Sequence, residues 1–215
     1  MTTTVSDRPG FVGRLRSRQA GHPSGMLGRI IGRAMVRDTA AANDRALAAL
    51  DLTQRRTILD VGFGQGRTAS ILVRAGHTVI GVDTSPTMVK QATARNRAAC
   101  REGRATLRHG DGITIPFPDD SADAAIAAHT IYFMPEPAAT IADIARVLKP
   151  GGTLVIACRT SDDETPAWVD PEIYRIPTAA QIVTMLHSAG FDENDHEPGD
   201  ASNHQIHLFV ARLGT

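Results

Sequence analysis

The stretch Ile58–Leu72, ILDVGFGQGRTASIL, decides the fold. A short apolar run leads into glycines at positions 62, 64 and 66, and a helix-like run follows at once. Glycine permits positive φ and lets the backbone approach a ligand closely. In parallel α/β sheets, ligands bind where the strands end. Arg67 stands where the dinucleotide fingerprint requires its third glycine, which disfavours a pyrophosphate-binding loop. A tight turn that binds nothing is the alternative interpretation.

The rest of the chain repeats the alternation of apolar strands and amphipathic helices. The expected strands cover 57–61, 78–82, 105–109, 122–128, 153–157 and 204–213, and the expected helices cover 67–75, 86–100, 137–148 and 178–190. This alternation predicts a doubly wound, parallel α/β sheet, with the last strand added antiparallel.

Residues 1–50 precede this pattern and are predicted to form a mobile basic tail and a helical lid, while 51–215 form the main domain. The first 37 residues carry seven arginines and one acid, and apolar residues between 26 and 35 recur at helical spacing. The charge pattern also resembles an organelle transit segment, but a tail or lid is the preferred interpretation.

Composition excludes several classes of protein. The formal net charge is zero, which gives no signature of nucleic-acid binding. No apolar run approaches the roughly 20 residues that span a bilayer. Cys100 and Cys158 lack a metal-binding spacing, so a reduced, cytoplasmic protein is expected. We expect a small-molecule partner and a monomer or a homodimer.

The second expected strand ends at Asp83, 17 residues after Gly66. An acid at this place can accept both hydroxyls of an adenosine ribose, which NAD and S-adenosylmethionine share. Asp83 therefore does not discriminate between the two cofactors. Capping of the helix near Pro86 is the alternative role, although Thr84 and Ser85 also supply caps.

The stretch RHGDGITIPFPDDSADAAIAAH, residues 108–129, does distinguish between the two cofactors. With it, the chain resembles class I S-adenosylmethionine-dependent methyltransferases, and more narrowly the small-molecule group that includes the ubiquinone and menaquinone methyltransferases. The matching pieces cover about residues 57–191 and are, in order, ILDVGFGQG, GVDTSPTMV, HGDGITIPFPDDSADAAI, HTIYFMPEP, IARVLKPGGTLVIA and TAAQIVTMLHSAGF. The resemblance implies a Rossmann-like, seven-stranded sheet in the order 3-2-1-4-5-7-6 with the last strand antiparallel.

The resemblance also implies S-adenosyl-L-methionine as the cofactor and a role for each motif. Asp60 would order the glycine loop and help to hold the ammonium end, and the backbone of Gly62, Gly64 and Gly66 would face the methionine part. Asp83 would bind the ribose. The residues around the adenine would be Thr84, Met88, Asp111 (which accepts its amino group), Gly112 and Ile113. The KPGG turn at 149–152 would be structural.

His129 ends the fourth strand, where the transferable methyl group is expected. A histidine with a pKa near neutrality suits removal of a proton from a hydroxyl. Packing of the ring, with only the backbone at the cofactor, and metal binding are the alternatives. An NPPY-type motif is absent, which disfavours amide nitrogen acceptors.

The acceptor is expected near Tyr132 and near an insertion at 159–177 that holds Trp168 and Tyr174. The insertion is either a solvated loop or a lid over the acceptor. Its carboxylates could bind sugar hydroxyls, an amine or a divalent cation such as Mg²⁺, but the sequence does not identify a metal site.

We therefore predict a small-molecule methyltransferase, with oxygen of a sugar or another polar metabolite as the favoured acceptor. Nitrogen or carbon methylation stays open, as does a methyltransferase-fold protein that binds the cofactor without turnover. A nicotinamide-dependent oxidoreductase is the remote alternative.

Overall fold

The computed structural model describes residues 40–200 and 205–215. Most of the predicted basic tail and helical lid, including the segment 11–37 that we expect to cover the cofactor, therefore lies outside the described residues. The helices are α3 (Ala40–Ala48), α4 (Arg67–Arg74), α5 (Pro86–Arg95), α6 (Arg97–Arg101), α7 (Pro137–Val147) and α8 (Ala179–Ser188), with a 3-10 turn, η1, at Ile131–Phe133. The strands are β1 (Thr57–Val61), β2 (Thr78–Asp83), β3 (Ala105–His109), β4 (Ala122–Ala128), β5 (Leu148–Cys158), β6 (Phe191–Glu197) and β7 (His207–Leu213).

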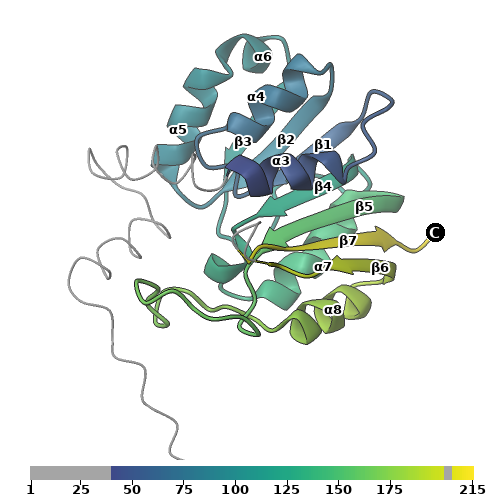
Figure 1. The fold of residues 1–215 in the computed structure, drawn as a ribbon. Coiled ribbons are helices and arrows are strands. Elements are labelled where there is room, and N and C mark those ends of the chain that lie inside the picture. The colour runs from purple at the N-terminus through teal and green to yellow at the C-terminus, as the bar shows by residue number, and fades with distance from the viewer. Residues whose placement is uncertain (1–39, 201–204) are drawn as a thin grey trace, which may run out of the picture.

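The strands form one seven-stranded sheet in the order β3-β2-β1-β4-β5-β7-β6 (Figure 1). Strands β1 to β5 are mutually parallel, and β7 runs antiparallel to both β5 and β6. The predicted fold class and strand order are confirmed. Because the parallel strands have their carboxyl ends at one edge of the sheet, Asp83 and His129 lie at that same edge.

Helices cover both faces of the sheet. In β4, Ala124 and Ile126 join the core beneath α3 and α4, whereas Ala125 and Ala127 join the core beneath α7 and α8. Successive residues of a strand point to opposite faces, so a strand covered on both sides is apolar throughout. Figure 1 shows α3 and α4 on one side of the sheet and α7 and α8 on the other.

Of the predicted N-terminal unit, the structure describes only residues 40–50. Here α3 packs on the sheet, and Ala46 and Leu47 are buried. Arg67, at the start of α4, forms an ion pair with Asp44 on α3 at 2.9 Å. The division at residue 50 and the lid stay predictions.

Two local expectations differ from the structure. The helix predicted over 86–100 is divided into α5 and α6 at Asn96, whose Nδ2 donates to the carbonyls of Ala92 and Gly66. The turn predicted at 149–152 lies within the long strand β5, where Gly151 has a φ of +74°. Within 40–200 and 205–215, no helix is both long and apolar enough to cross a membrane.

Candidate cofactor and acceptor site

The three glycines after β1 all have positive φ, but their surroundings differ. A Cβ on Gly62 would lie 2.0 Å from Cγ2 of Thr130, and one on Gly66 would lie 2.8 Å from Cβ of Ala92. A Cβ on Gly64 would meet no atom within 4 Å. Gly62 and Gly66 therefore let the loop pack against Thr130, just after β4, and against α5, while Gly64 faces open space.

Asp83 fixes the outer part of this loop. Its Oδ2 accepts the amide N–H of Gly64 at 2.8 Å, and its Oδ1 accepts that of Ser85 at 2.8 Å. The helix cap of α5 is supplied by Ser85, whose Oγ accepts the amide of Met88, so Asp83 does not perform that role. A carboxylate oxygen accepts more than one hydrogen bond, so the same group can also receive ribose hydroxyls.

Asp60 lies buried at the end of β1. Its Oδ2 is shielded from solvent and has no hydrogen-bond partner among the described residues. Burial, and secondarily the negative charge of Asp83, raise the pKa of Asp60 to about 7. Buried polar atoms are rarely left unsatisfied, so this oxygen marks a place where a ligand cation fits.

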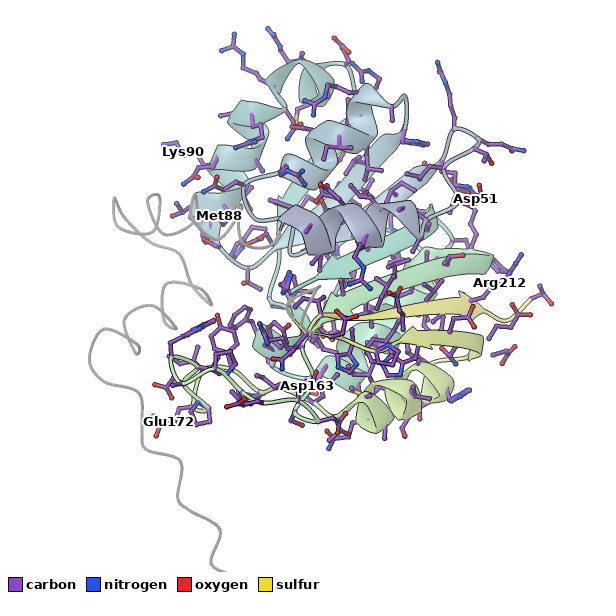
Figure 2. All side chains as sticks on the ribbon, viewed as in Figure 1. Asp51, Met88, Lys90, Asp163, Glu172 and Arg212 are labelled. Atoms are coloured by element: carbon purple, nitrogen blue, oxygen red, sulfur yellow. The ribbon has the colours of Figure 1, made fainter. Side chains whose placement is uncertain are left out.

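The predicted adenine-side residues gather around the loop after β3. Oδ1 of Asp111 accepts the amides of Ile113 and Thr114 at 2.8 and 2.7 Å, and these bonds lower the pKa of Asp111. A Cβ on Gly112, whose φ is +84°, would lie 3.0 Å from Cγ2 of Thr84. Met88 is buried at the start of α5, where Figure 2 labels it.

His129 has a left-handed backbone with a φ of +58°. Its amide donates to the carbonyl of Ala157 on β5 at 2.8 Å. The residue is partly exposed, yet its Nε2 is buried without a hydrogen-bond partner among the described residues. Burial, with a contribution from the positive charge of Arg159, lowers the pKa of His129 to about 4. The expectation of a pKa near neutrality was therefore wrong, because the ring is desolvated beside a cation.

The predicted acceptor residues lie together. The Tyr174 ring lies 5.6 Å from the Tyr132 ring and 5.8 Å from the Trp168 ring, and Phe133 packs edge-on at 4.8 Å. Tyr132 and Tyr174 are buried, while Trp168 and Phe133 keep some exposed surface. The Tyr132 ring is 6.4 Å from that of His129. Their role in acceptor binding stays a prediction.

The loop at 159–177 is tied to the antiparallel end of the sheet by histidines. Nε2 of His207 lies 2.6 Å from Oδ2 of Asp163, and its Nδ1 lies 2.8 Å from Nε2 of His196. Figure 2 shows Asp163 near the sheet and Glu172 toward the outer end of the loop. Across residues 40–200 and 205–215, no group of three or more His, Cys, Asp or Glu is arranged to hold a metal ion, so Mg²⁺ has no assigned site.

Two residues near His129 were not predicted. Thr130 has a buried Oγ1 without a hydrogen-bond partner in the described part of the chain. Arg159 directly follows β5, and its charge acts on His129 and on Tyr132. The position of Arg159, one residue beyond a parallel strand next to β4, was the available signal for it.

The chain is similar to known methyltransferases. A family described as "Methyltransferase domain" matches residues 59–156. A demethylmenaquinone methyltransferase of Tropheryma whipplei is 39% identical over 111 residues, which cover 52% of this chain and 45% of the relative. An O-methyltransferase of Pyrenophora dematioidea is 32% identical over 145 residues, which cover 62% of this chain and 53% of the relative. The matched segments thus span about half the length of these curated relatives.

Solved structures show the same fold. A chain in the complex between the Haloferax volcanii Trm112 methyltransferase activator and a methyltransferase superposes with a TM-score of 0.73 at 22% identity. The match covers 86% of this chain and 93% of the other. The family match, the relatives and the strand order together show that this chain carries a class I S-adenosylmethionine-dependent methyltransferase domain.

Proposed function

We propose that this protein transfers a methyl group from S-adenosylmethionine to a hydroxyl oxygen of a small molecule. The observation that carries the proposal is a cradle made of the open backbone at Gly64 and of two carboxyl groups. Asp83 accepts the amide of Gly64, and Asp60 lies close enough to Asp83 for their charges to interact. An O-methyltransferase among the relatives supports oxygen as the acceptor atom.

The residues of this cradle fit the three polar parts of the cofactor. The unsatisfied Oδ2 of Asp60 suits its ammonium group, and Asp83 suits its ribose hydroxyls. Asp111 lies in the loop just after β3, the strand next to β2, and suits the adenine amino group. When bound, S-adenosylmethionine supplies an electrophilic methyl group.

His129 and its neighbours then serve the acceptor. With a pKa of about 4, the imidazole of His129 is neutral at physiological pH and one ring nitrogen keeps a lone pair. That nitrogen orients the acceptor hydroxyl and receives its proton. Holding the hydroxyl in line with the methyl group supplies the remainder of the catalysis. Nitrogen or carbon acceptors, a homodimer and a cytoplasmic location stay open predictions.

Calorimetry with S-adenosylmethionine tests the cofactor assignment. Wild-type protein is expected to bind it and not NAD, and Asp83→Ala is expected to cost about 1–3 kcal/mol of binding free energy through loss of a charged acceptor. Asp195→Ala, at an exposed acid on the edge strand β6, serves as the matched control and is expected to bind normally. Binding of NAD instead, or equal losses in both variants, contradicts the proposal.

A further inference from the structure

The backbone holds Arg159 beside His129. The hydrogen bond from the His129 amide to Ala157 places the ends of β4 and β5 side by side. The Arg159 amide donates to the hydroxyl oxygen of Tyr132, whose ring lies near that of His129. Arg159 is thus fixed at the edge of the sheet where the acceptor is expected, by bonds that do not involve its side chain.

The guanidinium of Arg159 is a half-buried cation without an acidic partner in the described part of the chain. Its Nη1 donates to Oε1 of Gln205 at 2.9 Å, and no described carboxylate lies within the 4.0 Å of an ion pair. Its positive charge reaches both His129 and Tyr132. Next to it, Nε2 of His129 and Oγ1 of Thr130 are buried without partners among the described residues. A cation beside unsatisfied polar atoms is suited to an anionic oxygen.

We propose that Arg159 binds the acceptor oxygen as its anion, so that the preferred acceptors are acidic hydroxyls of the phenol or enol class. This inference rests on the proposed O-methyltransferase function and narrows its acceptor. It replaces the expectation of a sugar hydroxyl.

Magnitudes separate the two classes of acceptor. A cation within about 4–6 Å lowers the pKa of an acid by about 1–3 units. A phenol, with a pKa of about 10, then ionises appreciably near neutral pH. An alkyl alcohol, whose acidity is close to that of water at about 15.7, does not. His129 passes the hydroxyl proton on to water but does not hold it, because Arg159 and a bound sulfonium both disfavour the protonated imidazole. It therefore does not make an alkyl alcohol ionise.

The reaction balances with these groups. The hydroxyl proton leaves through His129 to water, and Arg159 holds the resulting oxyanion. A lone pair of that oxygen forms the O–C bond while the S–CH₃ bond of S-adenosylmethionine breaks. The electron pair of the broken bond stays on sulfur, which becomes the neutral thioether of S-adenosylhomocysteine.

A chromogenic probe tests the binding step without turnover. Nitrophenols of graded acidity are titrated by absorbance in the presence of protein saturated with S-adenosylhomocysteine. We expect the bound probe in wild-type protein to ionise at least about one pH unit below the free probe. Arg159→Gln is expected to abolish this shift, Arg159→Lys to keep most of it, and Arg175→Gln, an exposed arginine of the same loop, to leave it unchanged.

Turnover by the wild-type enzyme completes the test and does not depend on the folding of a variant. Phenols are expected to be methylated at least 100-fold faster than matched alkyl alcohols, because the gap of about six pKa units makes the ionised fraction of an alcohol smaller by far more than this factor. Comparable rates for alcohols, no binding of any nitrophenol, or an unchanged shift in Arg159→Gln overturns the role of Arg159. Failure to bind S-adenosylmethionine instead overturns the proposed function, so the two failures are distinguishable.

Discussion

Replacing Asp60 by Asn is expected to stabilise the ligand-free protein while it weakens cofactor binding. Asp60 is buried, and its pKa is about 7 in the folded state against an ordinary value of 3.8. The unfolded chain loses this proton near pH 4, whereas the folded protein keeps it to about pH 7. Over this window the folded state binds more protons, so the stability of the wild type falls as pH rises.

The size of the effect follows from the shift. About three pKa units at 1.36 kcal/mol each amount to about 4 kcal/mol, which is fully lost above pH 7. Asn cannot ionise, so residue 60 of the variant makes no pH-dependent contribution to the free energy of unfolding. The free energy of unfolding of Asp60→Asn minus that of the wild type should therefore rise by about 4 kcal/mol between pH 4 and pH 8.

Urea denaturation of both ligand-free proteins across this pH range measures the difference, and groups such as His129 that titrate in both proteins cancel. Asp195→Asn, at an exposed carboxylate, is the control and should give a flat difference. Calorimetry in two buffers of different ionisation enthalpy should show that the wild type releases a proton on binding S-adenosylmethionine at pH 6. A pH-independent difference between Asp60→Asn and the wild type, or unimpaired cofactor binding by the variant, would refute the reasoning.

Three further outcomes are expected. His129→Ala should lower kcat by about 10²-fold, the lower end of general-base catalysis, and the pH–rate profile of the wild type should show no limb from His129 near pH 6.5, because burial lowers the pKa of this residue to about 4; an unchanged kcat contradicts this role. Gly66→Ala should lower the free energy of unfolding by about 2–4 kcal/mol, because the new Cβ would meet Ala92 and the residue has a φ of +72°. Gly64→Ala should lower it by only about 1–2 kcal/mol, from backbone strain alone, and equal melting temperatures of the two variants would contradict this difference. Hydrogen exchange in residues 11–37 should slow when S-adenosylhomocysteine is added, and no change would contradict a lid.

The functional assignment combines local and long-range information. Asp60, Gly64, Asp83 and Asp111 could be proposed from the sequence because each occupies a fixed place in a motif at or just after the end of a strand, and their roles toward the cofactor stay predictions. Nothing in those motifs indicates that Gly66 is needed for packing against α5, while Gly64 alone of the three loop glycines faces open space. The spacing of the glycines thus identified the loop. Contacts between distant segments then showed that Gly66 serves packing and that Gly64 is left open to a ligand.

The sequence by itself determined the strand–helix alternation, because strands buried on both faces are apolar along their whole length. It did not reveal β6, Phe191–Glu197, from its local pattern, since an edge strand needs little apolar surface and only Phe191 is fully buried there. Only the tertiary structure determined the pKa of His129. Its lowered pKa comes from burial and from a cation 30 positions along the chain, and the electrostatic environment of a side chain is set by what folds next to it.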